Sequence, residues 1–322
     1  MKNVSIVIPL FNEEGVVDEL IKRLKHAVNG LNYSFEFIIV DDGSNDKTLE
    51  KLLVCKNSEH RLKILKLSKN WGQQNSYNAG LDNSGGDAVI LMDGDLEDPP
   101  EIIHSFLEKW EDGYDVVYGV KESRKVGFFS NICFSVFYKL LHFFSEVRVD
   151  PQAGMFSLMD RKVVKELKKC SEKNKYYVGL RFFAGFKQTK VNYHRSKRFS
   201  GVPKQTFRKL VNYGLNAFFS FSFLPVRLLT YFGLVLLLIM TLMIFIFILG
   251  KSTSISFWLL DQIRNFSDWT SIILAIFFAL SVQIIFLGIL GEYIARIFDE
   301  VRNRPYYVID QIYEADNKNK GL

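Results

Sequence analysis

The chain contains few cysteines and few prolines for its length. Three cysteines and seven prolines occur among 322 residues, and Cys55, Cys133 and Cys170 lie far apart with no CxxC spacing. We therefore expect neither a disulfide framework nor a zinc site, but three reduced cysteines in a cytosolic body. Charged residues make up 24% of the chain, and no internal repeat or low-complexity tract is visible. These features exclude a fibrous or a disordered protein.

Two glycine-rich phosphate loops are also missing. The sequence contains no G-x-G-x-x-G and no G-x-x-x-x-G-K-[ST], so the dinucleotide fingerprint and the P-loop are both absent. A bound nucleotide must then have its phosphates held by a metal and by basic side chains. No Ser-His-Asp or Cys-His arrangement is visible. The first residues run directly into a strand-like stretch, so we expect no secretory signal.

Charge is missing from two long runs in the last third of the chain. Residues 228–250 and 269–291 each form 23 consecutive uncharged positions. A helix needs about 20 apolar residues to cross a bilayer, and neither run has a polar face. The pattern predicts a hairpin of two transmembrane helices. The alternative is a pair of buried helices in a soluble core.

Acidic residues are absent from residues 173–227, which hold twelve lysines or arginines. The bridge between the two apolar runs has only Lys251 and Arg264, whereas five basic residues follow the second run. The positive-inside rule then predicts a multi-pass protein of the cytoplasmic (inner) membrane with its catalytic domain and both termini in the cytoplasm. Beside a membrane span, the basic stretch is better explained by lipid phosphates than by nucleic acid. We expect the lipid bilayer, and no nucleic acid, as a partner.

The first 120 residues alternate between strand-like and helical patterns. Such alternation predicts an α/β domain with a Rossmann-like, mostly parallel sheet. Ligands of these sheets bind at the carboxyl ends of the strands, where the polar clusters of this sequence fall. The predicted strands are 4–9, 35–40, 62–67, 88–92 and 115–118, and the predicted helices are 14–28, 46–53, 74–81 and 99–110.

Two further segments are rich in aromatic residues but interrupted by polar ones. Residues 128–147 predict an amphipathic helix in the membrane interface, with an ordinary core helix as the alternative. Residues 207–223 have a similar composition. The predicted organisation is a cytoplasmic domain, an amphipathic juxtamembrane segment, two transmembrane helices and a cytoplasmic tail, at 1–205, 206–227, 228–291 and 292–322.

Asp93-Gly94-Asp95 follows a predicted buried strand. Two carboxylates around one small residue can converge on a divalent cation, and hard oxygen ligands suit Mg²⁺ or Mn²⁺. Glu97 lies two residues further on and is a candidate third ligand. The alternative is a set of solvated loop carboxylates, because a lone D-x-D is a weak signal.

Asp41 and Asp42 end the second predicted strand. One of them is suited to accept hydrogen bonds from a base or ribose, and the alternative role is to cap the next helix. Arg195, Arg198 and Lys204 lie in a basic stretch that can bind phosphates. The alternative for that stretch is contact with anionic lipid.

Several motifs occur in order along the chain. They are P-L-F-N-E-E (9–14), V-D-D-G-S-N-D-K-T (40–48), N-W-G-Q-Q-N (70–75), M-D-G-D-L-E-D-P-P-E (92–101), G-F-K-Q (185–188), R-x-x-R-x-x-G-x-x-K (195–204) and F-S-F-L-P-V-R (221–227). Together they resemble the inverting glycosyltransferases of family 2, and the resemblance implies that residues 1–205 form the cytoplasmic nucleotide-sugar-binding catalytic domain. The second half resembles the polyprenyl-phosphate branch of that family, relatives of dolichol-phosphate mannose synthase that carry two C-terminal spans.

This resemblance implies a GT-A type fold and a nucleotide-sugar donor, usually a UDP-sugar such as UDP-glucose. It also implies a polyprenyl phosphate acceptor such as undecaprenyl phosphate, a lipid-linked monosaccharide for the cell envelope, and a homo-tetramer as one possible assembly. Among the residues, Asp93, Asp95 and Arg198 are implied to be catalytic. The nucleoside would lie against Pro9, Phe11, Glu13, Asp41 and Asp42, the metal on Asp93, Asp95 and Glu97, and the donor or acceptor phosphates against Lys121, Arg124, Arg195, Arg198 and Lys204.

The chain departs from the resembled pattern at 154–161, G-M-F-S-L-M-D-R. Met155 and Ser157 stand where that family often has an acid and an arginine, so the identity of a catalytic base stays open. An acceptor phosphate is already ionised near neutral pH and needs little deprotonation. Two alternatives are a processive polysaccharide synthase, whose Q-x-x-R-W motif is absent, and a non-enzymatic lipid-binding scaffold.

Overall fold

The computed structural model describes residues 1–121, 150, 153–170, 172, 175–194, 231–233, 235, 238–239, 242, 268–302 and 304–314. The chain divides into two compact units. One unit consists of Met1–Ser220 together with Arg304–Leu322, and the other is Phe221–Asn303. The predicted interfacial helix at 128–147 and the juxtamembrane segment at 206–227 lie outside the described residues.

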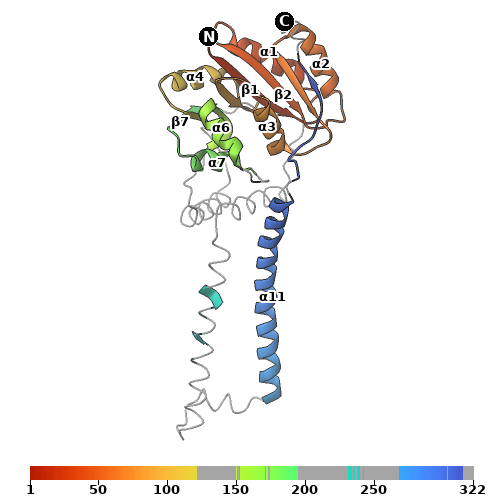
Figure 1. Cartoon of the computed structure of the whole chain (residues 1–322), viewed down its shortest axis with the longest axis vertical. Helices are drawn as coiled ribbons and strands as arrows, with labels where there is room; N and C mark the ends of the chain where they lie inside the picture. Colours follow the sequence, from red (N-terminus) through yellow and green to blue (C-terminus); the bar gives the residue numbers. More distant parts are fainter. Residues whose placement is uncertain are drawn as a thin grey trace. The chain divides into compact units, whose positions relative to one another are not determined.

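The first unit is built on a sheet in the order β7-β5-β6-β4-β1-β2-β3-β8 (Figure 1). The β1–β2, β1–β4, β2–β3 and β5–β7 pairs are parallel, whereas β6 and β8 pair antiparallel with their neighbours. This confirms the predicted α/β class and its mostly parallel sheet. The strands are β1 Asn3–Leu10, β2 Ser34–Asp41, β3 Leu62–Leu67, β4 Ala88–Leu91, β5 Val116–Lys121, β6 Ala153–Asp160, β7 Gln188–Tyr193 and β8 Ile309–Tyr313.

Helices cover both faces of the sheet because its central strands are apolar on both sides. On β1, Val4, Ile6 and Ile8 belong to the core cluster that includes α1 and α4, whereas Val7 is buried outside this cluster. Strands buried on both faces are typical of parallel sheets, and near-continuous hydrophobic runs follow from that burial. The helices of this unit are α1 Val17–Val28, α2 Thr48–Ser58, α3 Gln73–Asp82, η1 Pro100–Ile102, α4 Ile103–Glu111, α6 Arg161–Lys169 and α7 Tyr177–Phe183.

The α1 and α3 helices show how the two faces differ. In α1, apolar side chains recur at helical spacing, and all of the inward-facing ones are buried. In α3 the sequence is mostly polar, yet six consecutive residues from Ser76 to Leu81 are buried. The α3 helix is therefore enclosed by its neighbours, and its polar side chains must find partners inside the protein.

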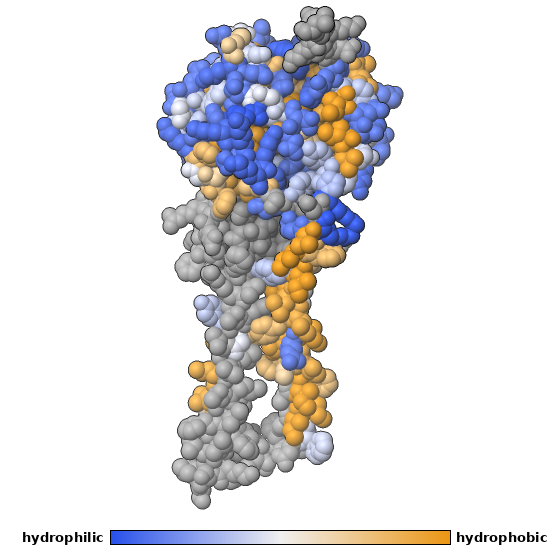
Figure 2. Space-filling view, in the orientation of Figure 1, coloured by the Kyte–Doolittle hydropathy of each residue, from blue (hydrophilic) through white to orange (hydrophobic). Residues whose placement is uncertain are grey.

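The second unit contains α11, Asp268–Val301, a helix of 34 residues. Its segment Ile276–Ala295 is long and apolar enough to cross a membrane, and its apolar side chains are exposed along the helix (Figure 2). This helix covers the second predicted span and extends beyond it. Within the described part of the chain it is the one such helix, and most of residues 228–250 lies outside that part. The predicted hairpin therefore stays a prediction.

Candidate active site

Three polar loops meet at one edge of the sheet because β1, β2 and β4 are parallel neighbours. Leu10, the last residue of β1, is in register with Asp41, the last residue of β2. On the other side, β1 pairs with β4, which leads into Asp93 and Asp95. The carboxyl ends of parallel strands form the ligand-binding edge in folds of this class. The structure thus brings the predicted acidic clusters to a common edge.

The loop after β1 is tied to the loop after β2 through backbone groups. The Asn12 N–H donates to Ser44 Oγ at 2.9 Å, and the Asn45 N–H donates to Asn12 Oδ1 at 2.8 Å. The Glu13 N–H donates to Thr48 Oγ1 at 2.9 Å. Asn12 has a positive φ of 50°, a conformation that asparagine tolerates better than most residues. Two loops distant in sequence therefore form one rigid rim.

Asp41 is fully buried at the end of β2. Its Oδ1 accepts a hydrogen bond from the Ser44 N–H at 3.2 Å, while Oδ2 has no hydrogen-bond partner among the described residues. Burial raises the pKa of this carboxyl above its ordinary value. A buried oxygen without a partner is costly, so the site is suited to a ligand group that donates a hydrogen bond.

Asp42 has a different role from its neighbour. Its two carboxylate oxygens accept hydrogen bonds from the backbone N–H groups of Trp71 at 2.7 Å and Gly72 at 3.0 Å. Asp42 therefore fixes the loop that precedes α3. The fit is close, because a Cβ at Gly43 would lie 2.4 Å from the backbone carbon of Lys69. Asp42 thus holds the loop before α3, and not the next helix that the capping alternative named.

Asp93 is held in place by two side chains from α3. Tyr77 Oη donates to Asp93 Oδ1 at 2.5 Å, and Gln73 Nε2 donates to the same oxygen at 2.7 Å. Burial, followed by the charges of Asp98 and Asp95, raises the pKa of Asp93 to about 6. Gln73 belongs to the resembled N-W-G-Q-Q-N motif, but the motif alone assigned it no role. Tyr77 was not predicted, because a tyrosine in a helix is more often a core residue.

The loop after Asp93 is tightly folded. Gly94 is required by close approach, since a Cβ there would lie 2.2 Å from Leu10 Cδ2. Asp95 Oδ1 accepts a hydrogen bond from the Glu97 N–H at 3.1 Å. Leu96 has a positive φ of 59° and is fully buried, so its side chain anchors a strained turn. The packing explains why only a small residue separates the two aspartates.

Asp98 is a buried carboxylate that was not among the predicted site residues. It accepts a hydrogen bond from Tyr193 Oη at 2.5 Å and forms an ion pair with Lys121 at 3.2 Å. Lys121 was predicted to approach the acceptor phosphate, and in this structure its ammonium group is paired with Asp98. No local pattern distinguishes Asp98 from the other acids of its loop, because its partners are contributed by β5 and β7.

The acidic residues of this loop do not form a ready-made metal cage. Within the described part of the chain, no three His, Cys, Asp or Glu side chains are grouped closely enough to hold a metal ion. The predicted trio of Asp93, Asp95 and Glu97 is thus not assembled in this structure. Asp93 and Asp95 still fit Mg²⁺ or Mn²⁺, because these ions often bind one or two carboxylates together with substrate phosphates.

The β6 strand carries the departure from the resembled motif. Ser157 is buried, and its hydroxyl donates to the Met155 carbonyl at 2.9 Å. Arg181 on α7 is also fully buried, and its Nη2 donates to the Gly154 carbonyl at 2.7 Å. Burial lowers the pKa of Arg181 to about 10. No local pattern singles out Arg181, which is one of twelve basic residues in an acid-free stretch.

The remaining predicted site residues fall into two groups. Pro9 is buried in β1, and Phe11 and Glu13 are half-buried at the rim next to Asp41. The contact of these three residues with a nucleoside stays a prediction. The other group, Arg124, Arg195, Arg198 and Lys204, lies outside the described residues.

A family model and the relatives of this chain agree with this geometry. The model of glycosyl transferase family 2 matches residues 5–168, which include the loops after β1, β2 and β4. The chain belongs to glycosyl transferase family 2, and it is a glycosyltransferase.

Particular relatives match over nearly the whole chain. An uncharacterized glycosyltransferase of Synechocystis sp. is 38% identical over 310 residues, covering 96% of this chain and 95% of that protein. The SfII prophage-derived bactoprenol glucosyl transferase of Shigella flexneri is 33% identical over 318 residues, covering 97% and 99%. Glucosyl-3-phosphoglycerate synthase from Mycobacterium tuberculosis, solved with Mn²⁺, UDP and glucosyl-3-phosphoglycerate, has a TM-score of 0.48 and 17% identity, covering 67% of this chain and 77% of that chain.

Proposed function

We propose that this protein is a membrane-bound, inverting glycosyltransferase that transfers glucose from UDP-glucose to a polyprenyl phosphate. The observation that carries the proposal is the position of Asp41, whose buried Oδ2 has no partner among the described residues at the sheet edge that also holds Asp93 and Asp95. The whole-length similarity to a bactoprenol glucosyl transferase supports the choice of sugar and acceptor.

In this proposal the donor nucleoside binds beside the loops after β1 and β2. Asp41 Oδ2 accepts a hydrogen bond from the base or the ribose, while Pro9, Phe11 and Glu13 lie next to the nucleoside. Asp42 contributes indirectly, because both of its oxygens already hold the Trp71–Gly72 backbone. The rigid rim means that little ordering is needed when the nucleotide binds.

The diphosphate of the donor lies beside Asp93 and Asp95. These two carboxylates would hold Mg²⁺ or Mn²⁺, with Glu97 nearby, and the bound cation would neutralise charge on the leaving diphosphate. Tyr77 and Gln73 orient Asp93 by donating to one of its oxygens. Arg124, Arg195, Arg198 and Lys204 are proposed to bind the phosphates of donor and acceptor, with Arg198 nearest to the reaction.

The chemistry requires no strong base. A phosphate oxygen of the acceptor attacks the anomeric carbon, a new C–O bond forms, and the bond to the diphosphate breaks, releasing UDP. The acceptor phosphate is already ionised near neutral pH, so Met155 and Ser157 in β6 are compatible with transfer. Because attack occurs opposite to the leaving group, an α-linked donor gives a β-linked lipid sugar. Catalysis then depends on positioning and on charge stabilisation.

The sheet also constrains the proposed membrane topology. The β7 strand ends at Tyr193, and β8, which begins at Ile309, is part of the same sheet. A chain that leaves a sheet and returns to it crosses an intervening membrane an even number of times. If α11 crosses once, another crossing is needed before it, and residues 228–250 are apolar enough to supply it. This supports a hairpin with both termini in the cytoplasm, and a homo-tetramer remains part of the proposal by resemblance alone.

The test uses the purified full-length protein in detergent micelles with undecaprenyl phosphate, Mn²⁺ and a panel of UDP-sugars. We expect UDP release with UDP-glucose, and a lipid whose mass is increased by one hexose. The Asp95→Asn variant serves as the inactive control. Release of UDP without a glycosylated lipid would refute the acceptor, and an α-linked lipid product would refute the single displacement.

A further inference from the structure

The C-terminal segment, defined as residues 304–314, belongs to the same compact unit as the catalytic sheet. Its strand β8 pairs antiparallel with β3, with Leu65 opposite Ile312 and Lys66 opposite Gln311. Without β8, the β3 strand would form an open sheet edge. The segment begins three residues after Val301, the last residue of α11.

One contact of this segment leads to the nucleoside side of the site. The Ser68 N–H donates to the Val308 carbonyl at 2.9 Å. Ser68 Oγ in turn accepts a hydrogen bond from Trp71 Nε1 at 3.2 Å, and the Trp71 N–H donates to Asp42 Oδ1 at 2.7 Å. Three consecutive hydrogen bonds therefore connect the C-terminal segment with the carboxylate that follows Asp41.

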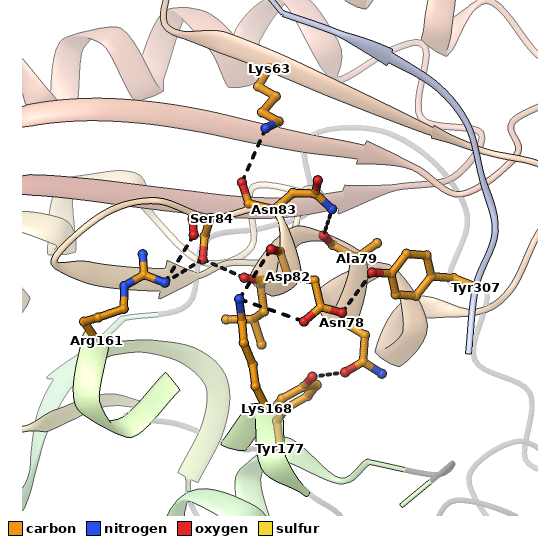
Figure 3. A network of polar contacts seen from close by, with 11 residues as sticks. Lys63, Asn78, Ala79, Asp82, Asn83, Ser84, Arg161, Lys168, Tyr177 and Tyr307 are labelled. Atoms are coloured by element: carbon orange, nitrogen blue, oxygen red, sulfur yellow. Dashed lines mark hydrogen bonds and ion pairs between the residues drawn. The ribbon is translucent and has the colours of Figure 1, made fainter. Parts of the chain in front are cut away.

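A second contact leads to the diphosphate side. Tyr307 Oη donates to Asp82 Oδ2 at 2.8 Å, and Asp82 is the last residue of α3 (Figure 3). The first residue of that helix, Gln73, and Tyr77 one turn later donate to Asp93. A single helix of ten residues is thus fixed to the C-terminal segment at one end and holds a site carboxylate at the other.

The surroundings of Asp82 show that this end of α3 is fixed from several sides. Lys168 of α6 donates to the Asp82 carbonyl at 3.4 Å, and Arg161 donates to the Ser84 carbonyl at 3.1 Å (Figure 3). On the buried side, Tyr177 Oη donates to Asn78 Oδ1. Tyr307 is the contribution of the C-terminal segment to this network, and it reaches α3 across more than 200 residues of sequence.

Other contacts dock the segment but do not reach the site. Lys66 forms an ion pair with Asp310 at 2.6 Å, Lys63 pairs with Glu314, and Lys56 Nζ donates to the Glu314 carbonyl at 2.6 Å. Exposed pairs of this kind contribute little stability individually. They fix the register of β8 on β3, and the register determines where Tyr307 and Val308 lie.

We propose that the C-terminal segment is a positioning element of the donor site, acting through Tyr307 on α3 and through Val308 on the loop from Ser68 to Gly72. The inference rests on the proposed function, because Asp41 and Asp93 are donor-binding residues in that proposal. A strand that only covers the edge of β3 would be insensitive to the Tyr307 hydroxyl. A positioning element requires that hydroxyl, since it is the atom that reaches Asp82.

The test compares two tyrosines of the same segment in the full-length protein. Tyr307→Phe removes the hydroxyl that contacts α3, whereas Tyr313→Phe removes one whose hydrogen bond stays within β8, on Gln311. We expect Tyr307→Phe to raise the KM for UDP-glucose by about 3- to 10-fold, because only part of the stabilisation lost with this hydrogen bond is transmitted through α3 to the site. The kcat should stay within about twofold, because the reacting atoms keep their contacts once the donor saturates the site. Tyr313→Phe should leave both constants unchanged.

A spectroscopic readout separates this inference from the proposed function. Trp71 lies on the hydrogen-bonded path, so its fluorescence, isolated by subtracting the Trp71→Phe signal, should change when UDP and Mn²⁺ bind. We expect Tyr307→Phe to raise the UDP concentration at which this fluorescence change is half complete, by the same factor as the KM. Ser68→Ala keeps the backbone bond to Val308 but removes the Ser68 Oγ that accepts from Trp71 Nε1, and so interrupts the other hydrogen-bonded path. It should produce a shift in the same direction and provides a second variant if Tyr307→Phe folds poorly.

The outcomes are distinct. If Tyr307→Phe and Ser68→Ala match Tyr313→Phe in KM and in the Trp71 signal, the inference is overturned while the proposed function stands. If the wild type transfers no sugar but binds UDP, the proposed function fails and the Trp71 titration still decides the inference. If the wild type binds no UDP, both fail. In a double-variant cycle, Tyr307→Phe should add nothing to Asp82→Ala, because the two changes remove one contact.

Discussion

Asp41 and Asp42 are adjacent acids with opposite surroundings. One has an oxygen without a partner in the described part of the chain, and the other is saturated by two backbone N–H groups. The sequence predicts that two acids follow a buried strand and therefore lie at the ligand edge. It cannot predict which of them remains available, because the partners of Asp42 are about thirty residues away and their position depends on how the two loops pack.

Substitution of these two residues should separate stability from donor binding. Asp42→Asn replaces one of two backbone-bound oxygens with an NH₂ group, and we expect it to lower the free energy of unfolding by about 1–3 kcal/mol. Asp41→Asn removes a buried charge whose pKa is raised, so its Tm should not fall, whereas its KM for UDP-glucose should rise. Thermal unfolding and steady-state kinetics measure both effects. A fall in Tm for Asp41→Asn with unchanged KM would contradict these roles.

The pKa of Asp93 makes the metal response depend on pH. Its folded-state pKa of about 6 lies above the ordinary value of 3.8, so the charged carboxylate destabilises the fold increasingly as pH rises between these values. A divalent cation binds the ionised form. We therefore expect Mn²⁺ with UDP to raise the Tm more at about pH 7.5 than at about pH 5, as judged by differential scanning fluorimetry. Asp93→Asn should abolish the difference, and equal shifts at both pH values in the wild type would count against Asp93 as a ligand.

At the level of elements, the first half of the sheet was predictable and the second half was not. The predicted strands and helices up to residue 118 are confirmed, with the second helix extending to Ser58. Alternating apolar runs identify parallel strands well because such strands are buried on both faces. The sequence analysis missed β6, β7 and β8, whose order depends on pairing between distant segments. In particular, β8 has only five residues, and most of them are not buried.

The α3 helix illustrates how an element is predicted without its function. Residues 74–81 predict a helix, and the structure confirms α3, but the pattern does not show that Tyr77 reaches Asp93. We expect Tyr77→Phe to lower kcat/KM about tenfold, because it removes a short hydrogen bond to a charged group. Comparison with Tyr118→Phe, a tyrosine on β5 with a different carboxylate partner, controls for the loss of a hydroxyl. Equal losses in both variants would argue against a specific role for Tyr77.

At the level of the whole molecule, the pairing of β8 with β3 is as informative about topology as hydropathy. The sequence predicts two spans from composition, and the described structure contains a helix suited to the second of them. The return of the chain to its own sheet is what requires an even number of crossings. No local sequence pattern contains that information, because it depends on a contact between residues about 250 positions apart.

Topology is testable with single cysteines in a variant that lacks Cys55, Cys133 and Cys170. Ser254→Cys lies in the bridge between the predicted spans, and Asn317→Cys lies in the tail. In intact cells, a maleimide that cannot cross the membrane should label Ser254→Cys and leave Asn317→Cys unlabelled until the cells are opened. The reverse pattern would contradict the proposed orientation, and labelling of neither in intact cells would contradict the hairpin.

The pairing of β8 also sets an order for the making of this protein. In the proposed topology, α11 reaches the insertion machinery before the sheet receives its final strand, because β8 is translated after α11. Until then β3 exposes unpaired backbone groups, which are the kind of edge that chaperones shield and proteases attack. A polypeptide that stalls during insertion would therefore remain unfinished at this edge, and the cell could recognise it there.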